Sequence, residues 1–589
     1  MANEVKGVDR PLKDILATAL VSYYQIPDYQ RPYQWTEKNC TKLLDDLFSS
    51  YEYYKENKES DYFCDSLVLI LISEDSKKAR TYDIVDGQQR LSTFILLTKV
   101  LSALYDKNLN STSRELLEKS LGDIDGEKRE RLHFNAMGLN AEDDFQDALD
   151  FFDDSHHVNK NDKNNYLKNA VCLKDYLKEK EIESIGKFIK WLYFNVKFIT
   201  IICPNIDKAL RIFNVLNARG LPLNATDIFK VELLKKLANK KDQEEFVSRW
   251  SALHQKCSGN ESKFPKRKEN KREKNATETL FSWYLTYLNP VTSGKSMEER
   301  LADQFERLNK PPLEYFKGVE DFYNAYGEVL EMQDRHAYLL SYVASDYWRV
   351  VLCASLLHHY SDQDIEALKE LLVKFCYQHW IAGRTKPQIA QTCCNIINAL
   401  KEKKSMDYIT SIVKKYLDDY NVLQRFKENL EDNNLYKKLY NKRLSCLKPI
   451  LILVEYFMSD NANPAYIKMD DDLHVERILP QNPDPSSQWV KDFSEEEREL
   501  YTHSLANLTL LGGKKNTKAL SQALNQDFKE KKEIYMGKTI MLDNKKTFKV
   551  MTCYDMTKND VCNYTEWTPT SLEKRKEELI QIIESVLAL

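Results

Sequence analysis

Residues 83–91 read DIVDGQQRL and set the architecture expected for the first part of the chain. The opening residues are typical of a β-strand, Gly87 permits a tight turn, and the polar residues that follow are typical of a helix start. A helix amino terminus presents unpaired N–H groups and the positive end of the helix dipole, so this unit can hold an anion. Asp86 could hold a magnesium ion and Arg90 could neutralise a phosphate. An ordinary turn is the alternative interpretation.

The residues around this unit predict a small α/β unit over residues 1 to about 120, followed by a mostly helical chain. Short strands are expected at Tyr62–Ile72 and Thr81–Val85, and a helix at Leu91–Tyr105. Residues from about 120 to 235 and from about 276 to 455 show helical spacing. From about 470 we expect short strands at Leu473–Leu479 and Leu505–Leu511 and a closing helix at Ser571–Ala588.

Composition excludes several classes of protein. The chain has 589 residues with 86 Lys and Arg against 90 Asp and Glu, a net charge of −4. This balance excludes a uniformly basic nucleic-acid coat, although not a local basic patch. Apolar runs are far shorter than the ~20 residues of a membrane span, and the amino terminus lacks the apolar core of a signal peptide. With 12 cysteines and no CxxC pair, we expect free thiols, a cytoplasmic location and no membrane partner.

A second motif, IPDYQRPYQW, occupies residues 26–35. Its prolines stiffen the segment, and Arg31 stands among aromatic residues. A guanidinium held between rings is suited to bidentate phosphate binding. Taken alone, the segment fits a rigid hydrophobic plug with an exposed arginine better. The sequence contains no GxxxxGK[ST], so any nucleotide site is not a P-loop.

Two further segments have simple interpretations. In FNVLNARGLPL, residues 213–223, Gly220 and Pro222 would end a helix, and a plain helix–loop–helix joint explains the pattern. The basic run ESKFPKRKENKREKN at 261–275 has the composition of an exposed loop, with a phosphate-contacting arm as the alternative.

The carboxyl-terminal part contains DLHVERILPQNP at 472–483 and LANLTLL at 505–511. A strand carrying His474, a second strand carrying Asn507 and a later Asn516 could form a one-metal nuclease site. In such a site a histidine deprotonates water and a hard cation stabilises the phosphate charge. A lone histidine beside a glutamate is usually structural, whereas an asparagine inside an apolar strand needs hydrogen-bond partners.

Taken in order, these segments resemble the GmrSD-type enzymes, which are modification-dependent (type IV) restriction endonucleases of anti-phage defence. Three segments resemble motifs of the family's N-terminal domain: IPxYQRxYxW, DGQQR and FxxLNxRGxxL. Four features resemble motifs of its C-terminal domain: ExILPQ, NLTLL, a later asparagine and FxxKxxxY. The resemblance covers roughly residues 10–235 and 446–589, as in the fused single-chain members of the group, and the middle helices are similar only in texture.

The resemblance implies an α+β, predominantly helical fold in three parts. These are a ParB/sulfiredoxin-like α/β domain that binds and hydrolyses a nucleotide (1–235), a helical middle region (236–445) and a His-Me-finger (HNH-like) nuclease domain (446–589). It implies a nucleoside triphosphate, namely GTP, UTP, CTP or ATP, and modified double-stranded DNA as partners, with Mg²⁺ or Mn²⁺ as cofactor.

Site residues follow from the resemblance position by position. The nucleotide-binding positions are Arg31, Asp86, Gly87, Gln88, Gln89 and Arg90. In the nuclease motif, Asn507 orients the strand and loop that position the general base. Asn516 is the expected metal ligand, beside Asp86 in the N-terminal domain.

Two positions depart from the family. Its C-terminal motif is His-x-x-Pro, but Arg477 stands three residues before Pro480, and arginine cannot act as a general base near neutral pH. His474 lies an odd number of residues away and therefore faces the other side of a strand. An unpaired Arg477 would be costly, because it shares a strand face with apolar residues. The milder departure is Phe63-Cys64-Asp65, where the family has Phe-Leu-Gly.

Two hypotheses follow. The first is a nucleotide-regulated, metal-dependent endonuclease of anti-phage defence that acts on modified foreign DNA, in which Arg477 replaces the general base of an otherwise intact nuclease. The second is a nuclease-dead DNA-binding sensor that uses nucleotide binding and hydrolysis as a switch. The sequence leaves open the DNA modification, the nucleotide, the oligomeric state (a homodimer included) and whether Arg477 is natural or introduced.

Overall fold

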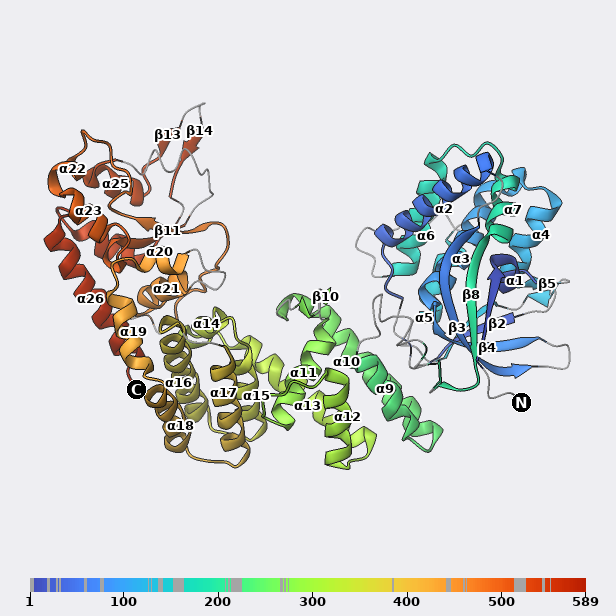
Figure 1. Cartoon of the computed structure of the whole chain (residues 1–589), viewed down its shortest axis with the longest axis horizontal. Helices are drawn as coiled ribbons and strands as arrows, with labels where there is room; N and C mark the ends of the chain where they lie inside the picture. The colour runs from blue at the N-terminus through green and yellow to red at the C-terminus, as the bar shows by residue number, and fades with distance from the viewer. Residues whose placement is uncertain are drawn as a thin grey trace. The chain divides into compact units, whose positions relative to one another are not determined.

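The computed structural model is mostly helical (66%) with a small mixed sheet, which confirms the predicted α+β, predominantly helical class. It divides into two compact units, one formed by Met1–Thr279 with Met297–Phe316 and the other by Leu280–Ser296 with Lys317–Leu589 (Figure 1). The structure describes all residues except 1–4, 19–21, 28–29, 31–32, 58–60, 75–78, 125–126, 129, 136–140, 152–163, 207, 210–211, 213–224, 265–267, 270–271, 274, 384–385, 441–445, 459–460, 462, 513–525, 543–545 and 551.

The first unit is built on a six-stranded mixed sheet with the order β1-β8-β3-β4-β2-β7. β3 pairs with β8 in parallel and with β4 antiparallel, while β2 pairs in parallel with both β4 and β7. The strands are β1 (Lys6–Pro11), β2 (Ser22–Ile26), β3 (Tyr62–Glu74), β4 (Arg80–Asp86), β7 (Leu132–Phe134) and β8 (Val196–Cys203).

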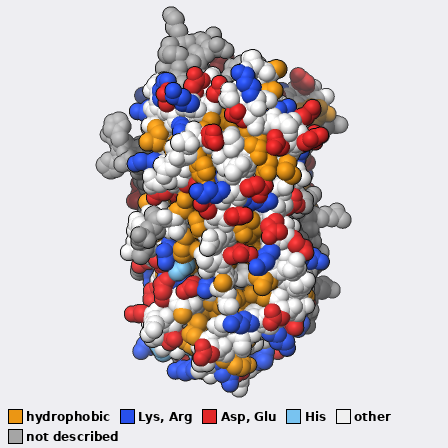
Figure 2. Space-filling view, turned by 90° about the vertical axis from the view of Figure 1, so that its left-hand side faces the viewer, with side chains coloured by type: hydrophobic (Ala, Val, Ile, Leu, Met, Phe, Trp, Pro, Cys, Tyr) orange, Lys and Arg blue, Asp and Glu red, His pale blue; other side chains and the backbone are white. Residues whose placement is uncertain are grey.

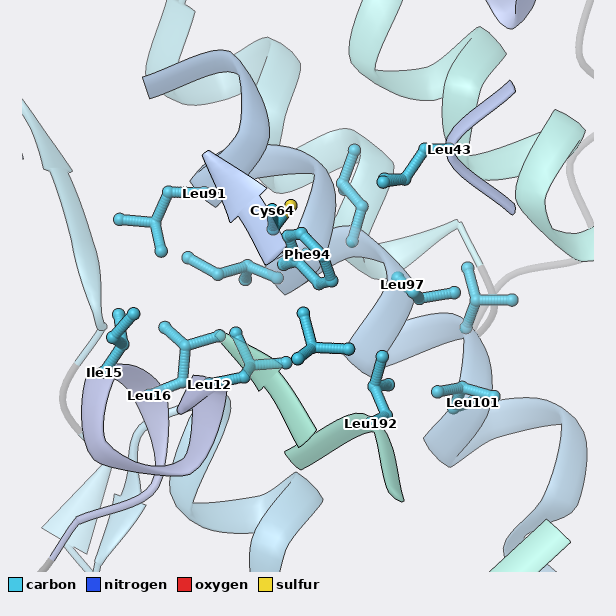
Figure 3. Close-up of a cluster of buried hydrophobic side chains, with 14 of the residues drawn as sticks. Leu12, Ile15, Leu16, Leu43, Cys64, Leu91, Phe94, Leu97, Leu101 and Leu192 are labelled. Carbon is cyan, nitrogen blue, oxygen red and sulfur yellow. The ribbon is translucent and has the colours of Figure 1, made fainter. Parts of the chain in front are cut away.

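Apolar residues alternate along β3 and β4 and fill a core on each face of the sheet. One face contributes Leu67, Leu69 and Ile84 to a large core that also holds side chains of α1, α2, α3, α6 and α7 (Figure 3). The opposite face contributes Val68 and Val85 to a smaller core with α9. The helices of this unit are α1 (Leu12–Leu16), α2 (Glu37–Asn57), α3 (Gln88–Tyr105), α4 (Ser111–Ser120), α5 (Ala141–Asp150), α6 (Asn165–Glu179), α7 (Ile185–Asn195), α9 (Ala225–Lys235), α10 (Lys240–Gly259) and α12 (Met297–Leu308).

The sequence predictions for the sheet are confirmed for β3 and β4, and the predicted helix at Leu91–Tyr105 starts three residues earlier, at Gln88. The helical prediction for residues 120–235 is wrong at β7 and β8. Residues 196–203 read VKFITIIC, a run rich in β-branched residues, and this strand lies inside the sheet between β1 and β3. Local spacing could not reveal its partners, which are more than 100 residues away in the sequence.

The basic run at 261–275 is not entirely a loop. Its described residues form a short 3₁₀ turn at Glu261–Lys263 and a hairpin of β9 (Lys268–Glu269) and β10 (Arg272–Glu273). A second short hairpin is formed by β5 (Asp123–Ile124) and β6 (Glu127–Lys128).

The second unit begins with the helices predicted for residues 276–455. These are α13 (Pro312–Glu331), which like α11 (Ala276–Leu288) extends across the boundary between the units, α14 (Arg335–Ser341), α15 (Tyr347–Leu357), α16 (Asp362–Ile381), α17 (Lys386–Lys401), α18 (Met406–Asp419), α19 (Val422–Glu431), α20 (Leu435–Tyr440) and α21 (Leu447–Met458). Gln378 of α16 donates a hydrogen bond to the carbonyl of Leu587 (2.5 Å), which fastens the end of the last helix to this bundle.

The carboxyl-terminal part carries a small antiparallel sheet of β11 (Leu473–Arg477), β12 (Leu508–Gly512) and β15 (Thr552–Cys553). The predicted strand at Leu505–Leu511 is wrong in its first turn, because Leu505–Asn507 form a 3₁₀ turn (η3). Around this sheet lie α22 (Gln488–Asp492), α23 (Glu495–Tyr501), α25 (Phe528–Tyr535), the hairpin of β13 (Ile540–Leu542) and β14 (Lys546–Phe548), a short π-helix (Met556–Asp560), a 3₁₀ turn (Val561–Asn563) and α26 (Pro569–Leu587).

No helix among the described residues is long and apolar enough to cross a membrane. Each cysteine whose side chain is described is a free thiol, as expected from the sequence.

Candidate functional site

The DGQQR motif forms the junction between β4 and α3. Gly87 has a φ of +94° and caps α3, and a Cβ atom there would lie 2.8 Å from a Leu67 side-chain carbon and 3.2 Å from the Ser66 carbonyl oxygen. Only glycine therefore fits both the backbone conformation and the space. The turn sets Gln88 and Gln89, both buried, and the half-buried Arg90 in the first turn of α3, which is the part of a helix that binds anions in many proteins.

The structure brings the IPDYQRPYQW segment and this junction together. The Gln89 side-chain oxygen accepts hydrogen bonds from the backbone N–H groups of Gln34 (2.8 Å) and Trp35 (3.1 Å). Gln30 donates in the other direction, to two backbone carbonyls of β4 at 3.0 and 2.6 Å. Two motifs more than 50 residues apart thus share one hydrogen-bonded site. Arg31 of this segment lies outside the described residues.

Arg90 is held by β3. Its guanidinium donates to the Asp65 carboxylate (Nη2 to Oδ2, 2.5 Å) and to the backbone carbonyl of Ser66 (3.2 Å).

Asp86 is half-buried at the end of β4. Burial raises the pKa of the neighbouring Cys64 thiol to about 12, so Cys64 is not a thiolate nucleophile at neutral pH. The FNVLNARGLPL segment, residues 213–223, lies outside the described residues.

The carboxyl-terminal motifs meet at the end of β11. Asn507, fully buried in the 3₁₀ turn before β12, accepts a hydrogen bond from the Leu479 N–H (2.6 Å) and donates to the Leu479 carbonyl (2.9 Å). It also donates to the Thr502 carbonyl (3.0 Å) and accepts from the Trp567 indole (3.3 Å). The amide is thereby fully used, and it fixes the chain just after β11.

Replacing Asn507 with alanine should destabilise this part of the protein. The Leu479 N–H and two carbonyls would stay buried without partners, and each such group costs about 1–3 kcal/mol. We expect the free energy of unfolding to fall by roughly 3 kcal/mol in urea titrations followed by tryptophan fluorescence. The exposed Asn559, whose side chain donates a hydrogen bond to the Asp555 carboxylate on the same turn (2.8 Å), is the matched control, and equal losses for both variants would contradict this role.

Lys531 of α25 fastens the same segment from a second side. Its side chain is fully buried, and its Nζ donates to the carbonyls of Arg477 (3.0 Å) and Ile478 (2.7 Å) and pairs with Glu476 (2.9 Å). Tyr535, one helical turn further along α25, donates to the same Glu476 carboxylate (3.3 Å). Burial lowers the pKa of Lys531 and the Glu476 charge opposes this shift. Lys531 and Glu476 belong to the FxxKxxxY and ExILPQ motifs of the sequence, but these motifs alone do not indicate that the two side chains form an ion pair.

Arg477 is the last residue of β11 and is not an unpaired charge. Its guanidinium donates to the Gln481 side chain (2.9 Å) and lies 4.6 Å from the ring centre of Tyr436. The cost expected for an unpaired arginine on this strand is therefore avoided. His474 is half-buried on the same strand and lies opposite Leu511 of β12. Asn516 lies outside the described residues.

A histidine that the sequence analysis missed lies close to Arg477. His503 is 5% exposed, its ring lies 5.9 Å from that of Tyr436, and its Nδ1 atom is buried without a hydrogen-bond partner among the described residues. Burial, aided by the positive charges of Lys437 and Arg477, lowers its pKa to about 4. Its isolated position in the sequence, YTHSL, offered no spacing signal.

The lowered pKa of His503 predicts an acid-sensitive stability. Between pH 6.5 and 4 the unfolded histidine binds a proton and the folded one does not, so the free energy of unfolding should fall as the pH drops through this window. A His503→Gln variant should lose roughly 1–3 kcal/mol of that pH dependence. Chemical denaturation at pH 7 and pH 4.5 measures the difference, and identical pH profiles for both proteins would contradict the prediction.

Neither predicted site coincides with a cluster of donors typical of a bound metal. Among the described residues such groups are Glu130–His133–Glu142 and Asp334–His336–Glu366, and neither contains a predicted site residue. In the second group, Lys369 pairs with both carboxylates, which accounts for the cluster without a cation.

Two family models match the chain. The model of the GmrSD restriction endonuclease N-terminal domain matches residues 12–234, and the model of the GmrSD restriction endonuclease C-terminal domain matches residues 422–582. The two matches contain the β4–α3 junction and the β11–β12 site, respectively. No curated protein matches the chain.

Proposed function

The chain belongs to the GmrSD restriction endonuclease family, and from this premise we propose that it is a nucleotide-regulated, metal-dependent DNA endonuclease acting on modified foreign DNA in anti-phage defence. The family establishes a DNA endonuclease that acts in restriction. The nucleotide, the metal, the modified substrate and the cytoplasmic location belong to the proposal.

The nuclease proposal rests on one observation: the backbone of residues 477–479, at the end of β11, is hydrogen-bonded by side chains from two sides. Asn507 and Lys531 hold the backbone of residues 477–479 from two sides. A general base must lie within hydrogen-bond distance of the water that it deprotonates. The backbone that carries the base must therefore be held rigidly. Antiparallel β11 and β12 followed by α25 support a His-Me-finger arrangement.

The proposed metal is Mg²⁺ or Mn²⁺, held in the nuclease domain by Asn516. An amide oxygen is a suitable ligand for these hard cations, and the metal when bound would stabilise the charge on the cleaved phosphate. Asn507 and Lys531 hold the backbone at Arg477 in place, but the Arg477 side chain itself cannot accept a proton.

For the N-terminal domain we propose a ParB/sulfiredoxin-like fold that binds and hydrolyses GTP, UTP, CTP or ATP. Gly87 permits the turn, the first turn of α3 offers N–H groups, and Arg90 offers a forked cation for a phosphate. Asp86 is the residue of this junction that we propose for the accompanying metal. Arg31, Gln88 and Gln89 complete the proposed set, with Gln89 holding the second motif in place.

DNA binding must rest on local positive charge. Figure 2 shows blue and red side chains interspersed over the visible face, without a continuous basic area among the side chains it colours by type. The duplex is strongly anionic, so phosphate contacts by a limited number of lysines and arginines are expected. The five bases at 266–268, 271 and 272 are one candidate arm.

The satisfied contacts of Arg477 favour a second candidate function, a nuclease-dead sensor that binds DNA and uses nucleotide turnover as a switch. The guanidinium has a hydrogen-bond partner and an aromatic neighbour. Such contacts are expected of an arginine that is the natural residue at this position. In this case the chain binds DNA and hydrolyses nucleotide without cutting.

The test uses the purified full chain with Mg²⁺ or Mn²⁺ and each of the four nucleoside triphosphates. Nucleotide hydrolysis and DNA retention are measured with genomes from phages that carry different base modifications and with unmodified plasmid. We expect hydrolysis of at least one nucleotide and stronger retention of one modified DNA. Absence of both activities would contradict both candidate functions.

A further inference from the structure

Asp65 stands in a conformation that its residue type disfavours. Its φ is +93°, in the left-handed region that glycine populates readily and other residues rarely do. The pairing of β3 with β8 shifts register here, because Phe63 pairs with Lys197 and Ser66 with Ile199, so β3 carries one extra residue. Such bulges turn a side chain out of its regular direction and often occur beside functional sites.

The bulge aims the Asp65 carboxylate at Arg90. One carboxylate oxygen contacts the Arg90 Nη2 at 2.5 Å, and the other accepts from the Ser66 N–H at 2.8 Å. The Ser66 carbonyl receives the other arm of the same guanidinium at 3.2 Å. Both terminal nitrogens of the guanidinium, Nη1 and Nη2, therefore donate a hydrogen bond to β3, and a phosphate that binds the fork of these two nitrogens competes with those contacts.

A carboxylate and a phosphate oxygen are chemically equivalent partners for a guanidinium. We propose that Asp65 is a built-in competitor of phosphate, which a nucleotide must displace from Arg90 in order to bind. The inference rests on the proposed nucleotide function of the β4–α3 junction and deepens it. It makes Asp65 a residue that sets affinity, without a part in hydrolysis itself.

The geometry explains why displacement is feasible. The Asp65 side chain is 60% exposed and that of Arg90 is 24% exposed, so water can solvate the carboxylate once it is released. Pairs of this kind are weak because water screens them. An incoming triphosphate carries more charge than the carboxylate and also meets the N–H groups at the start of α3. The competitor therefore lowers affinity without closing the site.

The test compares the full chain with Asp65→Asn and Asp65→Gly by calorimetric titration of each nucleoside triphosphate with Mg²⁺ and of inorganic tripolyphosphate. Asparagine and glycine both tolerate a positive φ, so both variants should fold. We expect each to bind about three- to tenfold more tightly, because the pair is partly exposed and screened. The gain should disappear when Arg90 is also replaced by glutamine.

Glu74→Gln is the matched control. It removes one negative charge from the same strand, where Glu74 pairs with Arg80 at 3.1 Å, and it should leave the affinity unchanged. Equal or weaker binding by the Asp65 variants, with the unsubstituted chain binding normally, would overturn the competitor and leave the nucleotide site intact. Failure of every protein to bind any of these anions would overturn the nucleotide site and the competitor together.

Discussion

Arg477→His should convert the protein into an active, metal-dependent DNA endonuclease. A guanidinium stays protonated near neutral pH and cannot take a proton from water, whereas a neutral imidazole can. A positioned general base contributes about 10²- to 10⁴-fold to rate, so we expect a gain of that order. Nicking and linearisation of supercoiled plasmid and of modified phage DNA, with Mg²⁺ or Mn²⁺, measure it.

The hydrogen bonds that hold the backbone of residues 477–479 should survive the substitution. Asn507 and Lys531 bind backbone atoms of residues 477–479 and not the Arg477 side chain. The losses are the contact with Gln481 and the stacking on Tyr436, and a stacked cation at a partly exposed site is worth about 0.5–1 kcal/mol. The variant should therefore fold nearly as well as the unsubstituted chain.

Arg477→Gln is the matched control, because glutamine also removes the guanidinium but is no base. If the histidine and glutamine variants are equally inactive while DNA is still bound, the sensor function is supported and the inactivated nuclease is not. If the unsubstituted chain already cuts at the rate of the histidine variant, another residue supplies the base. His503, close to Arg477 and neutral at physiological pH because its pKa is lowered to about 4, would then be the first residue to replace.

Local patterns predicted much of the fold. The apolar, β-like run at residues 62–72, the Asp86-Gly87 turn and the helical spacing after it lie within one short stretch, and the structure has β3, β4 and α3 there. The prediction failed at β8, whose place between β1 and β3 depends on strands that are distant in the sequence. Pairing of this kind is a tertiary effect that a local window does not contain.

The same distinction applies to the sites. The sequence singled out Asn507 as a buried amide that needs partners, and the structure supplies four. It placed Asn507 on a strand, because the apolar run continues through the 3₁₀ turn. Asp65 stood out in the sequence only as a mild departure from the family pattern. Its role could not be predicted, because neither the bulge nor the contact with Arg90 can be inferred from neighbouring residues. Roles that depend on long-range contacts, such as that of Lys531, were not predictable.

Arg90→Ala should remove most or all nucleotide hydrolysis. A hydrogen bond from a charged group is typically worth about 1.5–3 kcal/mol, which corresponds to a fall in kcat/KM of roughly 10- to 150-fold, and more if Arg90 also stabilises charge that develops during the reaction. Phosphate release assayed over a range of nucleotide concentrations measures the change.

Two further variants separate the fork of Arg90 from its charge and from charge in general. Arg90→Lys keeps a cation but cannot make two parallel bonds, so it should recover only part of the activity. Arg80→Ala removes an arginine from the other end of β4, where it pairs with Glu74, and should hydrolyse nucleotide at the unsubstituted rate. Undiminished turnover by Arg90→Ala would move the phosphate site away from the β4–α3 junction. It would also remove the reason for a competing carboxylate at Asp65, because the two residues would then form only a surface ion pair.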